Sequence, residues 1–298
     1  MEKILKVHRV GDYARYIGAP DLHPLVSVIH YDELQHCRHS LNSYDVYALF
    51  IGDEELENLS YGRLQYDLHR HALMCVSPGE IGGKTDTGEE IHTKGRALLF
   101  DTTLLQKSEL GRRMPSYTFF SYSVSEALLL TAEQRQSIVA LLEEIRNELL
   151  HHNDPHTLRI VTSQIEQLLE LVARYYGEQL STAATTDRSD LLSRFERMLS
   201  HYYEAGLQRQ QGLPSVRYCA SELFLSPNYF GDLIHELTGN TASHHIRRFI
   251  MQRAQQLLLS GTSIADTARL LGFDYPQHFT RVFKKHFGLT PSAFLKDK

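Results

Sequence analysis

The chain has 298 residues, of which 42% are hydrophobic and 22% are charged, and a formal net charge of −5 at pH 7. This length accommodates two domains, each with a core of its own. The three cysteines are scattered and odd in number, which argues against a disulfide framework and a CxxC metal site. The N-terminus lacks a basic-then-apolar leader, and no apolar run approaches membrane-spanning length, so we expect a cytoplasmic protein without a membrane partner.

The charge is divided unevenly along the chain. Residues 190–298 contain 13 lysine and arginine residues against 9 aspartate and glutamate residues, a net charge of +4, whereas residues 1–189 carry a net charge of −9. Only the C-terminal part therefore favours a polyanionic partner such as a phosphate backbone.

The first 125 residues are typical of short strands separated by turns. Apolar or aromatic runs alternate with glycine, proline and aspartate, which break regular structure. The expected strands are residues 25–31, 44–51, 72–76, 97–100 and 117–122. Several strands this short predict a sandwich or barrel, which we place in a first domain of residues 1–130.

From residue 131 the apolar spacing becomes helical. Two stripes predict a helix pair with a turn at residues 152–155: Ile138, Leu141, Leu142, Ile145 and Leu149, then Ile165, Leu168, Leu169 and Val172. Because such stripes are too long to be left exposed, residues 131–180 are expected to pack partly on the β-domain and to form a self-association surface. The Ser/Thr-rich residues 181–189 are the expected linker, and a helix over 191–203 follows.

Residues 190–298 contain the same short helical unit twice, around residues 225–239 and 275–288. In each copy a shorter helix and a tight turn precede a helix with apolar residues at helical spacing, and a glycine ends that helix. Ser226 is a predicted N-cap with Pro227 after it, and Ser263 with Asp266 resembles a capping box. Apolar residues between positions 246 and 258 predict one long connecting helix. The pattern predicts an all-α domain with two helix-turn-helix units, an arrangement suited to DNA.

Residues from about 213 to 295 resemble the DNA-binding domain of the AraC/XylS family of bacterial transcription regulators. The residues that carry the resemblance are Ser263, Ile264, Ala265, Asp266, Ala268, Leu271, Gly272, Phe273, Phe279, Arg281, Val282, Phe283, Lys284, Lys285, Phe287, Gly288, Thr290, Pro291 and Ser292. The first reading helix departs from the family: Gly231 and Asp232 stand where members often place longer polar or basic side chains.

The resemblance implies a regulator of the α+β multidomain type that is not an enzyme and needs no cofactor. Its first domain would be a cupin-like, jelly-roll domain that senses a small-molecule effector of unknown identity. The helix pair would make a homodimer, and RNA polymerase is a further candidate partner. Double-stranded DNA would be read by Asn228 and Tyr229, carried over by position, in the first helix.

In the second reading helix the expected base contacts are Gln277, Thr280 and Arg281. His278, Lys284 and Lys285 are expected nearer the phosphates.

Two other hypotheses concern the first domain. His69 and His71 have the alternate spacing of metal ligands on a strand, which would suit a metal-dependent cupin enzyme fused to a DNA-binding domain. No further ligands complete such a site, and a hairpin turn at this position is the favoured interpretation. The domain could instead serve only dimerisation and partner docking, without a ligand.

Overall fold

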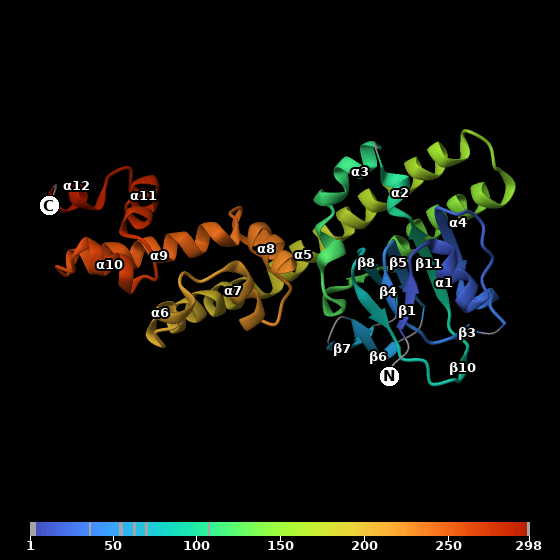
Figure 1. Ribbon diagram of the computed structural model, residues 1–298, viewed down its shortest axis with the longest axis horizontal. Coiled ribbons are helices and arrows are strands. Elements are labelled where there is room, and N and C mark those ends of the chain that lie inside the picture. Colours follow the sequence, from blue (N-terminus) through green and yellow to red (C-terminus); the bar gives the residue numbers. More distant parts are fainter. Residues whose placement is uncertain are drawn as a thin grey trace. The chain divides into compact units, whose positions relative to one another are not determined.

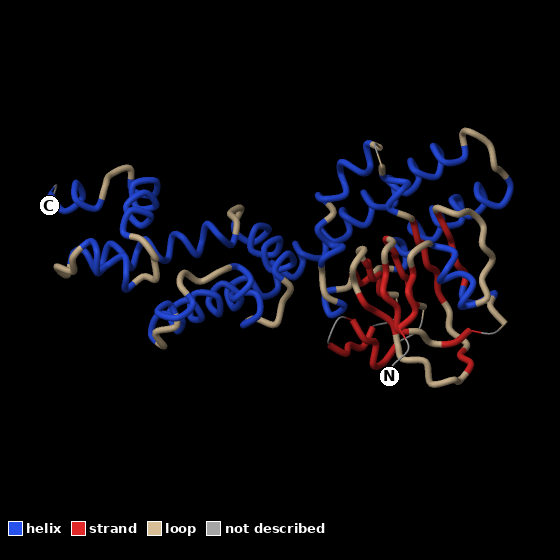
Figure 2. Tube along the Cα trace, viewed as in Figure 1, coloured by secondary structure: helices blue, strands red, loops and turns tan. Residues whose placement is uncertain are grey.

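The computed structural model describes residues 4–35, 37–53, 56–61, 64–68, 71–106 and 108–296, with side chains at all of these except 56–61, 64–68 and 183–189. The chain divides into two compact units, residues 1–179 and 180–298. The first is rich in strands and the second is helical (Figure 2). The broad α+β division predicted from the sequence is confirmed.

Two five-stranded sheets organise the first unit (Figure 1). One has the order β1 (Ile4–Val7), β4 (Leu41–Tyr44), β9 (Ile81–Gly83), β6 (Leu56–Tyr61), β7 (Leu64–Leu68). The other has the order β12 (Leu128–Leu129), β8 (Ala72–Val76), β5 (Tyr47–Gly52), β11 (Gly95–Phe100), β2 (Val26–His30), and β3 (Cys37–Arg38) pairs separately with β10 (Glu90–Ile91). Among the described strands the hydrogen bonding therefore gives open sheets and no closed barrel.

The second sheet is buried on both faces. Ala97 and Leu99 of β11 belong to the core that also contains α1 (Val10–Ile17), whereas the alternate residues Leu98 and Phe100 are equally buried on the opposite face. Helix α4 (Ala132–His151) packs against β2 and β11. Burial on both faces explains why these strands read as continuous apolar runs, since no solvent-facing positions interrupt them.

The aromatic segment 117–122 forms no strand, and the strand prediction was wrong here. After α2 (Thr102–Leu105) and α3 (Glu109–Arg113), short 3-10 turns follow at Met114–Ser116, Thr118–Ser121 and Val124–Glu126. Phe119 stacks on Tyr176 with ring centroids 5.5 Å apart, and Tyr122 meets the same ring edge-on at 5.1 Å. A strand would send neighbouring side chains to opposite faces, whereas the turns bring several rings into one core.

The helix pair is present, and its apolar stripes are buried inside the first unit. Thr131 caps α4 by accepting a hydrogen bond from the Gln134 backbone at 3.2 Å. Both predicted stripes are buried, and Leu168 and Leu169 of α5 (Thr157–Glu204) are 0% exposed. Side chains packed in their own unit are not available to a partner, so self-association through residues 131–180, which stays a prediction, would have to use the exposed residues of the helix pair.

The expected linker at residues 181–189 is helical. Helix α5 continues through this segment to Glu204 and contributes residues to both units. The segment contains serine, threonine and alanine but neither glycine nor proline. Each serine or threonine destabilises a helix by only about 0.5 kcal/mol relative to alanine, so a helix can continue through this segment.

The second unit contains both predicted helix-turn-helix pairs. Its helices after α5 are α6 (Gln208–Gln211), α7 (Val216–Glu222), α8 (Pro227–Thr238), α9 (Ala242–Leu259), α10 (Ile264–Leu270), α11 (Pro276–Phe287) and α12 (Pro291–Lys296). Ser226 accepts from the Tyr229 backbone at 3.3 Å and Ser263 from the Asp266 backbone at 3.0 Å, as the capping residues predicted. Gly239 and Gly288 end α8 and α11 with left-handed backbones.

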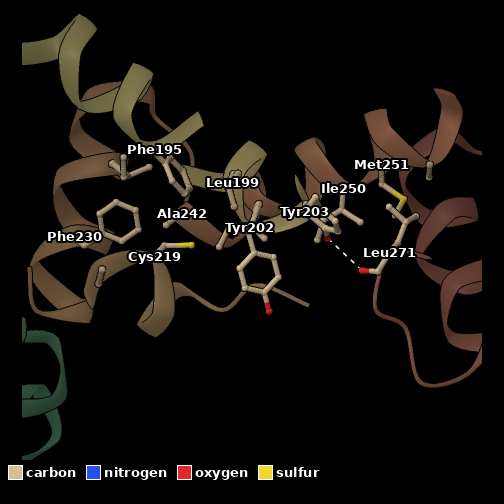
Figure 3. Packing of buried hydrophobic residues seen from close by; sticks show 14 of the residues in the cluster. Phe195, Leu199, Tyr202, Tyr203, Cys219, Phe230, Ala242, Ile250, Met251 and Leu271 are labelled. Carbon is tan, nitrogen blue, oxygen red and sulfur yellow. Dashed lines mark hydrogen bonds between the residues drawn. The ribbon is translucent and has the colours of Figure 1, made fainter. Parts of the chain in front are cut away.

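The end of α5 packs against both helix-turn-helix pairs (Figure 3). Phe195 meets Phe230 of α8 edge-on, with centroids 5.2 Å apart. The Tyr203 hydroxyl donates to the Leu271 carbonyl beyond α10 at 3.2 Å, drawn dashed in Figure 3. Together with α9, this part of α5 gives the two pairs one common core.

Candidate nucleic-acid interface

Helix α11 separates an apolar face from a cationic one. Phe279 and Phe283 are fully buried, while Gln277, Arg281 and Lys284, spaced one helical turn apart, are exposed. Lys285 and His278 are exposed beside them. Within the described residues, Arg281, Lys284 and Lys285 make no ion pair, so their charges are available to an anionic partner.

Two of the predicted residues on α11 have partners within the helix or its surroundings. The Thr280 hydroxyl donates to the Pro276 carbonyl at 3.0 Å, which leaves its oxygen as an acceptor and its methyl group as an apolar contact. The His278 ring meets Phe273 edge-on at 5.4 Å and keeps an exposed edge. Both side chains remain on the outer side of the helix, and neither is part of its buried stripe.

The first reading helix, α8, offers fewer contacts. Asn228 is exposed near its N-terminus, but Tyr229 is half-buried against the core of the second unit. Asp232 and Glu236 place carboxylates on the helix, and Glu236 accepts from the Ser181 hydroxyl at 3.0 Å. Helix α8 therefore carries negative charge, whereas α11 carries positive charge.

The structure adds two residues that the sequence analysis did not select, Ser243 and Arg247. One surface hollow is lined by Ser243, Arg247, His278 and Val282. An adjoining hollow contains Ser243 again, together with Asn228 and Asp232 of α8. The N-terminal part of α9 therefore lies between the two reading helices. The sequence did contain a sign of this role: Ser243 and Arg247 are four residues apart and so lie on one face of α9, a helix that the sequence analysis treated only as a connection.

Positive charge extends from this part of α9 to the end of α11. Burial lowers the pKa of His286, and the nearby His244, Arg247 and Arg248 lower it further. The pKa of His245 is lowered by burial and then by His244 and Arg248. The like-charge effects place His286 of α11 near Arg247 and Arg248 of α9, and the two arginines carry the positive charge that attracts an anion there.

The first unit contains a separate candidate site, a cavity of about 110 Å³ between its strands. Its apolar lining includes Phe50, Met74 and Val76. The hydroxyls of Tyr13 and Tyr31 lie 2.8 Å apart at the cavity, and burial raises the pKa of both, so they stay protonated at neutral pH. A largely apolar pocket with a few polar groups is the usual form of a small-molecule site.

Of the two histidines in the metal-site hypothesis, His69 lies outside the described residues and His71 is described. His71 has a left-handed backbone (φ 63°) and lies between β7 and β8, which pair in different sheets, so the predicted turn is not a hairpin turn. Its Nδ1 is 3.7 Å from an Asp53 oxygen. In the described ranges no three His, Cys, Asp or Glu residues converge as metal ligands.

Among the helices of these ranges, none combines the length and apolarity needed to cross a membrane.

The arrangement in the second unit defines a class, the double helix-turn-helix proteins. A family model described as a helix-turn-helix domain matches residues 219–297. The probable transcription factor PqrA of Proteus vulgaris is 32% identical over 94 residues, 31% of this chain and 76% of PqrA. The chain belongs to the AraC family of transcription regulators.

In two further relatives the match covers less than half of the relative's own chain. The regulatory protein PocR of Salmonella typhimurium is 33% identical over 138 residues, 45% of this chain and 44% of PocR. The transcriptional regulatory protein YesN of Bacillus subtilis, described as uncharacterized, is 37% identical over 84 residues, 27% of this chain and 23% of YesN. The chain thus spans less than half the length of these two relatives.

Proposed function

We propose that the protein is a sequence-specific transcription regulator that binds double-stranded DNA through α8 and α11. The two helices would enter successive major grooves on one face of the duplex, about 34 Å apart. The observation that carries the proposal is the cationic face of α11, which makes no ion pair with any residue that the structure describes, in a tandem helix-turn-helix unit. Family membership supports the same function.

The side chains divide into base readers and phosphate contacts. Gln277, Thr280 and Arg281 would read base edges from α11, and Asn228 with Tyr229 from α8. His278, Lys284 and Lys285 would contact phosphates. Ser243 and Arg247 would contact the backbone between the two grooves, since they lie between the reading helices.

The first unit would regulate this binding as a cupin-like, jelly-roll effector domain. Its two sheets and the cavity support a sensing role, and the cavity favours this over a module that only dimerises. The protein would act in the cytoplasm as a homodimer, with RNA polymerase as a partner at promoters. The dimer contact would lie on exposed parts of the helix pair, where Leu150 and Ile160 are 48% and 43% exposed.

Selection of bound duplexes from a random library tests the DNA-binding proposal. The full chain should enrich a defined sequence and bind it at least about 10³-fold more tightly than random duplex at physiological salt. Enrichment of no sequence, with equal affinity for all duplexes, would show a non-specific nucleic-acid binder.

Arg281→Ala should weaken binding to the selected duplex by about 1–3 kcal/mol and relax its sequence preference, because a guanidinium can contact a guanine edge through two hydrogen bonds. Competition binding against duplexes with single base changes measures both effects. Asp232→Ala is the matched control on α8, and loss of a carboxylate there should leave specific binding unchanged or tighten non-specific binding. Equal losses on specific and random duplex would reduce Arg281 to a phosphate contact.

Arg247→Ala should weaken binding to every duplex to a similar degree, because a phosphate contact carries no base information. The salt dependence of the binding constant, plotted as log K against log salt concentration, should lose about one unit of slope. Arg194→Ala removes an arginine from α5 that pairs with Asp190 at 3.8 Å, and it should leave the slope unchanged. A change of sequence preference in the Arg247 variant would show base reading instead.

A further inference from the structure

The cavity of the first unit contains a buried hydrogen-bond acceptor without a partner. Asn42 is 2% exposed and lines the cavity. Its Nδ2 donates to the Ser40 carbonyl at 3.2 Å and to the Tyr44 hydroxyl at 2.9 Å. Since a carbonyl can only accept, Nδ2 must face Ser40, and Oδ1 is then the free acceptor; it has no partner among the described residues. A buried acceptor of this kind destabilises the fold until a donor reaches it.

The rim of the cavity is cationic. Arg38, His39, Lys84 and Lys94 all line it. The charge of Arg38 is matched by Asp86, whose oxygens lie 3.2 and 2.6 Å from its guanidinium nitrogens. Lys84 makes no ion pair within the described residues, and it lowers the pKa of His39, which burial already lowers. Since no carboxylate of the described ranges pairs with Lys84, an anion at the rim would meet its uncompensated positive charge.

The acceptor and the lysine come from neighbouring segments of one sheet. Asn42 on β4 is in register with Gly82 on β9, and Lys84 follows two residues after Gly82. The Lys84 backbone N–H donates to the Ser40 carbonyl at 3.1 Å, and both Asn42 and Lys84 line the same cavity. The cavity of about 110 Å³ is somewhat smaller than an apolar cavity of roughly 150 Å³ that holds benzene, so its enclosed part takes a body no larger than a single ring, and a carboxylate would lie outside at the rim.

We infer that the effector is a small organic anion, a carboxylate on a compact body of single-ring size that also carries a hydrogen-bond donor. The carboxylate would pair with Lys84, the body would pack against Phe50, Met74 and Val76, and the donor would satisfy Asn42 Oδ1. This inference rests on the proposed sensing function and adds its ligand class. A neutral sugar fits less well, because a largely apolar lining leaves most of its hydroxyls without partners.

Calorimetric titration of the full chain with four probes tests the ligand class. 4-Hydroxybenzoate supplies the ring, the donor and the carboxylate; benzoate lacks the donor, 4-hydroxybenzamide lacks the charge, and 2-naphthoate exceeds the size. 4-Hydroxybenzoate should bind about tenfold more tightly than either benzoate or 4-hydroxybenzamide, and 2-naphthoate should not bind. Lys84→Met should reduce the preference for the acid over the amide to about twofold, whereas Lys6→Met, a change of an exposed lysine on β1 outside the cavity, should preserve it.

The inference is overturned if no probe binds, if the amide binds as tightly as the acid, if 2-naphthoate binds equally well, or if Lys84→Met keeps the full preference. Binding of the same samples to the selected duplex separates this result from the proposed function. Intact DNA binding with no probe binding leaves a regulator but removes this ligand class. Probe binding by a protein that selects no DNA sequence supports the site and contradicts the regulator.

Discussion

Replacing Leu168 and Leu169 together with alanine should unfold the first unit. Each leucine is completely buried, and truncation of a buried leucine costs about 2–5 kcal/mol. The residues are neighbours, so their effects need not add, but a combined loss of roughly 4–8 kcal/mol would remove most of the stability of an ordinary domain. Urea unfolding of the full chain, followed by circular dichroism, should show an early transition that the wild-type protein lacks.

Leu129→Ala provides the matched control, since this leucine of β12 is 53% exposed and lies outside the helix pair. Its removal should change the free energy of unfolding by no more than about 0.5 kcal/mol. If the double variant instead kept its wild-type unfolding curve and merely sedimented as a monomer, the stripe would be an intersubunit contact, as the sequence pattern had suggested, and the burial described for it would be contradicted.

Gly272→Ala should destabilise the second unit and impair the second helix-turn-helix pair. The residue has φ +88°, and a Cβ there would lie 2.9 Å from the backbone carbonyl carbon and oxygen of Gly212. The left-handed conformation costs a non-glycine residue about 1–3 kcal/mol, and displacing backbone costs about 1–3 kcal/mol more. We expect a loss of roughly 2–5 kcal/mol in the unfolding transition of this unit, with weaker DNA binding.

Gly239→Ala separates the two contributions to this effect. Gly239 has φ +70° but no atom within 4 Å of a built Cβ, so only the conformational cost applies and the loss should be the smaller of the two. Equal losses in the two variants would show that the contact between Gly272 and Gly212 is not tight.

Local signals explain why the second unit could be predicted well. Ser226, Ser263 and Gly239 each act on their own helix end, and their roles need no knowledge of distant residues. The same holds for β8, whose apolar run coincides with the observed strand. Which of the exposed side chains on α8 and α11 touch DNA stays a prediction.

The features that could not be predicted depend on distant parts of the chain. The rings at 117–122 take their conformation from Tyr176, about fifty residues later, and not from their own β propensity. The cavity combines Tyr13 of α1, Asn42 of β4 and Lys84 after β9, so no motif marks it. Arg247 appeared to be part of a spacer because its neighbourhood is created by the packing of α7 and α11 around α9.

Hydroxyl-radical footprinting of the full chain on its selected duplex tests the central claim most directly. The account predicts two protected windows on one face of the duplex, about 10 base pairs apart, one for each reading helix. Arg281→Ala should weaken the window assigned to α11 and leave the other in place. A single window, or protection spread evenly along the duplex, would contradict the assignment of α8 and α11 as two readers of successive major grooves.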